Sequence, residues 1–204
     1  MKLSKGYLVV FEGIDGTGKS TQSRLLMEDL RARELPVQLL AEPTQGFWGQ
    51  KIRKLLKEGR GYISPEEELS WFINDRREDV EKNIRPGLER NTILLLDRYY
   101  YSTAAYQGAL GMDPLKICRD NENFAPKPDL VFLFMLSPEK SLERIRNSRD
   151  DISSFEKLEY LKSVSRIFES FEDPVIRKID SDQPVEVVHD RLKRELDHLL
   201  AAKA

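Results

Sequence analysis

Five short stretches with the apolar content of strands recur along the chain, and stretches with helical spacing separate them. The candidate strands are residues 7–11, 37–40, 93–97, 130–136 and 175–180. Short apolar runs of this kind are typical of parallel strands that are buried on both faces. Strands that alternate with helices form a parallel sheet with helices packed on each side. The pattern therefore predicts an α/β fold of three layers, α/β/α, around a five-stranded parallel sheet.

Capping residues mark one helix start with particular clarity. Ser64 is suited to the N-cap, Pro65 to the first helical position and Glu67 to a capping box. In the helix that follows, apolar residues recur at spacings of three and four up to Ile84. Further helices are expected over about residues 19–34, 50–57, 113–123 and 154–171, and from residues 138 and 184 onward.

Arg76 interrupts the apolar stripe of the helix that begins after Ser64. A guanidinium on a buried face is costly unless an anionic group meets it. The partner can be a nearby carboxylate of the protein or a ligand. We favour the ligand, because Phe72 lies one turn earlier on the same face.

Residues 13–20 form a complete G-x-x-x-x-G-K-[ST] phosphate-binding loop between an apolar run and a helical pattern. Glycines let the backbone approach a phosphate closely, while backbone N–H groups and the lysine supply positive potential. The motif predicts a fold of the P-loop NTPase type with a nucleoside triphosphate as the ligand. The residues expected to bind it are Gly13, Ile14, Asp15, Gly16, Thr17, Gly18, Lys19, Ser20 and Thr21.

Polar residues follow the other candidate strands at their carboxyl ends. Glu42 follows the second strand, Asp97 and Arg98 end the third, and residues 180–183 end the fifth. Ligands of open α/β sheets bind at this edge. We therefore expect these groups to meet the phosphate loop, with Ser20 and Asp97 placed to hold Mg²⁺. Residues 99–108 add tyrosines, hydroxyls and one carboxamide, a composition suited to a base and sugar pocket.

An arginine-rich segment covers about residues 141–155 and includes Arg144, Arg146 and Arg149. It lacks a clean apolar stripe. One interpretation is a solvated, charged helix end. The other is a mobile lid that brings a guanidinium to a transferring phosphoryl group.

Composition narrows the classes of partner. The chain has 33 Lys and Arg residues against 35 Asp and Glu, a net charge of −2, which offers no general attraction to nucleic acid or to an anionic membrane. Cys118 is the single cysteine, so neither an internal disulfide nor a cysteine-based zinc site is expected. The composition does not change along the chain, so residues 1–204 are expected to form one domain. The single cysteine also favours a cytoplasmic protein.

Taken together, these residues resemble the thymidylate kinase family of nucleoside monophosphate kinases. The resemblance runs nearly end to end. It rests on Phe-Glu-Gly-Ile-Asp-Gly-Thr-Gly-Lys-Ser-Thr at 11–21, Glu42-Pro43, Phe72 with Arg76, the segments 97–99 and 105–108 with Ser102, 128–130 and 179–180. It implies phosphoryl transfer from ATP to dTMP, Mg²⁺ as cofactor and a homodimer.

The resemblance also implies roles for individual residues. Lys19 and its loop would hold the ATP phosphates, and Asp15 would reach towards the acceptor sugar. Arg98 and Arg53 would hold the acceptor phosphate. The remaining acceptor contacts would come from Phe72 stacked on the base, Arg76 and Gln107 at its edge, Tyr106 at the deoxyribose, and Glu42 and Ser102.

Some family members carry a catalytic arginine at the position of Gly16. With glycine here, the resemblance places that task on the lid, with Arg149 first and Arg144 and Arg146 after it.

One segment departs from the family pattern. Many relatives have Glu-Pro-Gly-Gly-Thr after the second strand, whereas this chain has Glu-Pro-Thr-Gln-Gly at 42–46. A kinase of another nucleoside monophosphate, or of a nucleoside, with the same ATP site therefore stays open as an alternative. A GTP-binding switch is disfavoured, because the sequence has no Asn/Thr-Lys-x-Asp motif.

Overall fold

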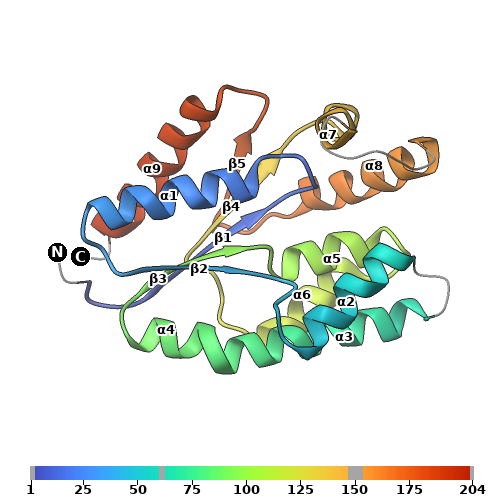
Figure 1. The fold of residues 1–204 in the computed structure, drawn as a ribbon, viewed down its shortest axis with the longest axis horizontal. Coiled ribbons are helices and arrows are strands. Elements are labelled where there is room, and N and C mark those ends of the chain that lie inside the picture. The colour runs from blue at the N-terminus through green and yellow to red at the C-terminus, as the bar shows by residue number, and fades with distance from the viewer. Residues whose placement is uncertain (1–2, 60–62, 147–153, 203–204) are drawn as a thin grey trace.

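The computed structural model describes residues 3–59, 63–146 and 154–202, and its centre is a five-stranded, all-parallel sheet (Figure 1). The strand order is β2-β3-β1-β4-β5. The strands are β1 (Tyr7–Glu12), β2 (Val37–Ala41), β3 (Ile93–Asp97), β4 (Leu130–Met135) and β5 (Ile176–Asp180). The five-stranded parallel sheet that the apolar runs predict is confirmed.

Helices cover both faces of this sheet, which confirms the three-layer prediction. Figure 1 shows α1 and α9 together on one face, and α3, α4, α5 and α6 on the other. The helices are α1 (Lys19–Ala32), α2 (Phe47–Glu58), α3 (Pro65–Asp79), α4 (Arg85–Glu89), α5 (Tyr100–Gly108), α6 (Pro114–Glu122), α7 (Pro138–Arg146), α8 (Ser154–Ser170) and α9 (Val185–Ala202). No helix in the described part has the length and apolar content needed to cross a membrane.

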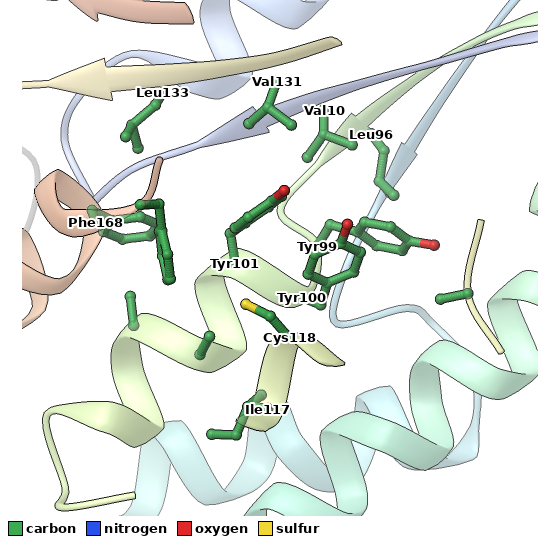
Figure 2. Packing of buried hydrophobic residues seen from close by; sticks show 14 of the residues in the cluster. Val10, Leu96, Tyr99, Tyr100, Tyr101, Ile117, Cys118, Val131, Leu133 and Phe168 are labelled. Carbon is green, nitrogen blue, oxygen red and sulfur yellow. The ribbon is translucent and has the colours of Figure 1, made fainter. Parts of the chain in front are cut away.

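Strand β1 is apolar from residue 7 to residue 11 because its side chains enter two different cores. Leu8 and Val10 point to the cluster under α5, α6 and α8, whereas Val9 and Phe11 point to the cluster under α1 and α9. Figure 2 shows the first cluster, where Val10 and neighbouring strand residues face Tyr99, Tyr100, Tyr101, Ile117, Cys118 and Phe168. Cys118 is a free, buried thiol that packs in this cluster.

Strand register brings the carboxyl ends of the sheet together. Asp97 at the end of β3 is level with Phe11 of β1 and with Ala41 of β2. On the other side, Met135 of β4 is level with Asp180 of β5. The residues that follow these strands therefore meet at one edge.

Two helices differ from their predicted extents. The helix after Ser64, whose hydroxyl accepts the N–H of Glu67 as expected of an N-cap, is not continuous to Ile84. A π-helical turn covers Val80–Ile84, and α4 follows with Pro86 in its first turn. Proline lacks an N–H and its ring crowds the carbonyl four residues earlier, which explains the irregular turn before it. Helix α2 begins at Phe47, three residues before the predicted start.

Candidate active site

The phosphate loop connects β1 directly to α1. Gly18 is the residue before α1 and has a left-handed backbone, with φ of 91°. Gly13 has φ of 132°, and a Cβ there would lie 2.5 Å from the carbonyl O of Phe134. Both positions therefore need glycine for their backbone conformation, and Gly13 needs it for the close approach as well. The loop leads into the N-terminus of α1, an arrangement that attracts anions.

Lys19 lies inside the loop and is 5% exposed. Its Nζ donates to the carbonyl O of Ile14 at 2.7 Å and to Oγ1 of Thr17 at 3.4 Å. Burial lowers the pKa of Lys19 to about 8, and the nearby Arg98 charge adds to the shift. A phosphate would relieve both effects, because its negative charge favours the protonated amine.

Ser20 and Asp97 meet as predicted, although 77 positions separate them. The hydroxyl of Ser20 donates to Oδ2 of Asp97 at 2.6 Å. Oδ1 of Asp97 is buried and has no hydrogen-bond partner among the described residues. A buried carboxylate oxygen beside a serine hydroxyl is chemically suited to a hard cation. In the part of the chain that the structure describes, no group of three or more His, Cys, Asp or Glu residues could hold a metal.

Arg98 joins the phosphate loop to α5. Its backbone is left-handed, with φ of 72°, and its N–H donates to the carbonyl O of Phe11 at 3.0 Å. Nη2 donates to Oδ1 of Asp15 at 2.5 Å, and Nη1 donates to Oγ of Ser102 at 3.0 Å. The guanidinium lies 5.3 Å from the ring centroid of Tyr106 and lowers the pKa of Asp15. Four predicted site residues thus form one polar cluster.

Glu12 lies next to this cluster, where it is bonded to Ser102, and it is completely buried. One carboxylate oxygen accepts the N–H groups of Tyr99 at 2.8 Å and Ser102 at 3.1 Å, while the other accepts the hydroxyl of Ser102. The Glu12 carboxylate therefore satisfies N–H groups at the start of α5. Burial raises the pKa of Glu12 to about 6, against these hydrogen bonds and the attraction of Arg98.

Arg76 and Glu42 form a buried ion pair, with Nη2 and Oε2 2.5 Å apart and side chains 1% and 4% exposed. Nη1 donates to Oδ1 of Asn121 at 2.7 Å, and Nη2 also donates to Oγ1 of Thr103 at 3.1 Å. Two partners were expected for Arg76, either a carboxylate of the protein or a ligand. The structure shows the first, the carboxylate of Glu42. Burial raises the pKa of Glu42, and Arg76 opposes that shift. Nε of Arg76 and Oε1 of Glu42 have no partner within the described chain.

Two other predicted acceptor residues lie nearby in the fold. Gln107 in α5 is completely buried, and neither atom of its side-chain amide has a hydrogen-bond partner among the described residues. An unsatisfied buried amide is costly, so a polar ligand would stabilise it. Phe72 is half-buried and packs beside Ile52, Leu55 and Trp71.

Helix α7, the first part of the predicted lid, is bound to the phosphate loop. Ser141 donates to the carbonyl O of Asp15 at 2.5 Å, and Nη1 of Arg144 donates to that of Gly16 at 3.4 Å. Nη2 of Arg144 donates to the carbonyl O of Ser181 at 3.1 Å. A Cβ at Gly16 would lie 2.8 Å from the carbonyl O of Ser141. Glycine at this position thus permits the close approach of α7.

The predicted lid contains two further arginines, Arg146 and Arg149. Arg149 lies outside the described residues, and the side chain of Arg146 is not described.

A family model described as thymidylate kinase matches residues 11–192. The chain belongs to the thymidylate kinase family. It is 45% identical over 201 residues to the thymidylate kinase of Desulfotalea psychrophila, covering 98% of each chain. It is 39% identical over 196 residues to the probable thymidylate kinase of Archaeoglobus fulgidus, covering 96% of this chain and 97% of that one. The thymidylate kinase of Akkermansia muciniphila is 45% identical over 192 residues, or 94% of this chain and 92% of its own.

Membership of the thymidylate kinase family confirms the resemblance and the enzyme class, a phosphotransferase of the nucleoside monophosphate kinase type. Three further residues support the site of this thymidylate kinase family member and were not predicted to do so: Glu12, Thr103 and Asn121. Glu12 could have been noticed, since it is an acid at the end of an apolar strand. No local signal links Thr103 or Asn121 to Arg76, because only the tertiary fold brings them together.

Proposed function

We propose that this enzyme transfers the γ-phosphoryl group of ATP to dTMP, producing dTDP and ADP. The proposal rests on a contact between the donor side and the acceptor side of the site. Asp15 of the phosphate loop pairs with Arg98, a candidate ligand of the acceptor phosphate. Donor and acceptor phosphates held on either side of this pair would lie close together, which is the main requirement of phosphoryl transfer.

On the donor side, the loop N–H groups and Lys19 would hold the β- and γ-phosphates. The Lys19 amine now bonded to the Ile14 carbonyl would turn to the phosphates. During transfer, the bond from the γ-phosphorus to its bridging oxygen breaks and ADP leaves with the electron pair. An oxygen of the acceptor phosphate forms the new bond. No protein nucleophile is needed, so the protein aligns the groups and stabilises their charge.

We infer that Ser20 and Asp97 would hold Mg²⁺. The fit rests on the buried, unpartnered Oδ1 of Asp97 beside the Ser20 hydroxyl. When bound, the cation would neutralise part of the negative charge on the ATP phosphates.

On the acceptor side, Arg98 and Arg53 would bind the monophosphate, and Asp15 and Tyr106 would border the sugar. The buried amide of Gln107 would pair with the base edge, with Phe72 against the ring. Arg76 would contact the edge of the base while it stays paired with Glu42. Ser102 would orient the guanidinium of Arg98 through their hydrogen bond. A base that pairs with Gln107 would satisfy polar atoms that are unpaired within the described chain.

We further propose that a lid arginine stabilises the transferring phosphoryl group. Arg149 is the first candidate, since Arg144 is engaged with the carbonyl groups of Gly16 and Ser181. Arg146 is the other candidate.

The test is a direct assay of the products. The enzyme with ATP, MgCl₂ and dTMP should release ADP and form dTDP in equal amounts, measured by chromatography. The Lys19→Ala variant should keep its circular dichroism spectrum and lose turnover. Near-normal turnover by Lys19→Ala, or ADP release without dTDP, would exclude the assignment.

We also infer a homodimer and a cytoplasmic location, from the family resemblance and the cysteine content respectively. The proposed interface elements are Trp71 and the helical segment over 66–84. Sedimentation at micromolar concentration tests the first inference, and cell fractionation tests the second.

A further inference from the structure

The segment that departs from the family pattern is tightly bonded, and Thr44 is at its centre. Its N–H donates to Oδ2 of Asp75 at 2.8 Å, and its hydroxyl donates to Oδ1 of the same carboxylate at 2.6 Å. The hydroxyl also accepts the N–H of Gly46 at 3.0 Å, directly before α2. One side chain therefore joins the loop after β2 to α3 and to the start of α2.

Asp75 is the partner in α3, and it is 1% exposed. Both of its oxygens accept hydrogen bonds from Thr44. A buried carboxylate is costly to leave unpaired, so these two bonds determine where the loop can lie on α3. Arg76, the next residue, belongs to the acceptor side of the proposed site.

Arg53 of α2 binds the carbonyl side of the same backbone, at residues 43 and 44. Nη2 of Arg53 donates to the carbonyl O of Pro43, and Nε donates to that of Thr44 at 3.4 Å. The Pro43 carbonyl and the Thr44 N–H belong to one planar peptide unit. Fixing the N–H on Asp75 therefore fixes the direction of the carbonyl that receives Arg53. These two bonds involve two of the five N–H donors of a guanidinium.

Helix α2 lies directly against this backbone. A Cβ at Gly49 would be 2.0 Å from the carbonyl O of Thr44, so only glycine permits the observed contact. The loop and the helix that carries Arg53 therefore form one packed unit.

We propose that Thr44 is a positioning residue for Arg53, with Asp75 as its fixed support, and that the pair sets the affinity for the acceptor phosphate. The proposal rests on the proposed function, in which Arg53 binds that phosphate. The proposal also explains why the sequence at 42–46 departs from the family pattern, because the threonine hydroxyl forms a side-chain hydrogen bond that glycine cannot form.

The test compares Thr44→Val with Thr44→Ser in the full-length enzyme. Valine keeps the shape and removes the hydroxyl, whereas serine keeps the hydroxyl. Thr44→Val should raise the KM for dTMP about tenfold, corresponding to roughly 1.4 kcal/mol, which is close to the lower end of the usual range for a hydrogen bond to a charged group. Its kcat and its KM for ATP should stay within about twofold. Thr44→Ser should restore the wild-type KM.

A double-mutant cycle tests whether Thr44 acts through Arg53. In the Arg53→Met background, Thr44→Val should change the KM for dTMP less than twofold, because the group that it positions is gone. Full additivity of the two effects would overturn the proposal. A second variant, Asp75→Asn, should also raise the KM for dTMP, because an amide cannot accept both hydrogen bonds from Thr44.

The outcomes distinguish a failure of the proposed function from a failure of the role of Thr44. A wild-type enzyme that does not phosphorylate dTMP would overturn the proposed function and this inference with it. A wild-type enzyme that does so, together with an unchanged KM in Thr44→Val, would overturn the inference alone. A lower melting temperature without a change in KM would show that the hydroxyl has only a structural role.

Discussion

Replacing Glu42 with glutamine should destabilise the folded enzyme far more than a single surface substitution. The change removes the negative partner of Arg76 while both side chains stay almost fully buried. Breaking a buried pair by removing one charge typically costs about 3–5 kcal/mol. For a chain of 204 residues, this corresponds to a melting temperature about 7–12 °C lower. Urea unfolding followed by circular dichroism gives the free energy directly.

An exposed pair of the same chemistry provides the control. Arg33 and Asp197 are 2.8 Å apart, with side chains 38% and 48% exposed. Asp197→Asn should therefore cost no more than about 1 kcal/mol. The double variant Glu42→Gln/Arg76→Met should cost clearly less than the sum of its single variants, because it leaves no unpaired charge. A loss below about 1 kcal/mol in Glu42→Gln would show that Glu42 does not carry the charge that compensates Arg76.

Three further predictions concern the phosphate loop and the lid. Because burial lowers the pKa of Lys19 to about 8, the affinity for ATP should fall as the pH rises through 8 and the amine loses its charge; calorimetric titration of wild type and Lys19→Ala checks this, and a flat wild-type profile up to pH 9.5 would refute it. Gly16→Ala should lose more stability than Gly111→Ala in urea unfolding, since both have positive φ, which costs roughly 1–2 kcal/mol with a side chain, but only Gly16 meets the Ser141 carbonyl. Equal losses would mean that this contact is not restrictive. Among single alanine variants of Arg144, Arg146 and Arg149, at least one should lower kcat strongly, with about 10³–10⁵ as an upper guide; if all three steady-state rates stay within about threefold, the lid carries no catalytic arginine.

The fold was predictable because its signals are local. A strand that is buried on both faces must be apolar along nearly its whole length, as β1 is over 7–11 and β3 over 93–96, and such runs are visible without any tertiary information. The N-cap at Ser64 is also a local feature. The apolar spacing continues through the π-helical turn at 80–84, so the spacing alone does not predict it; the turn directly precedes α4, which has Pro86 in its first turn.

The candidate site was predictable only where a motif or a strand end marked it. Ser20 and Asp97 could be paired in advance, since parallel strand ends share one edge of the sheet. The bonds of Thr44 to Asp75, and of Arg76 to Asn121, depend on how helices pack. No local pattern encodes those distances, so the supporting residues emerged only from the structure.

The choice of acceptor tests the central claim most directly. The enzyme would be given ATP with dTMP, dUMP, CMP, AMP, GMP or thymidine, and kcat/KM would be measured for each from the release of ADP. If the site around Arg98, Arg76 and Gln107 binds thymidine monophosphate, dTMP should have the highest value, and thymidine, which lacks the phosphate, should give almost no turnover. A higher value for CMP, AMP or GMP, or efficient turnover of thymidine, would contradict the account.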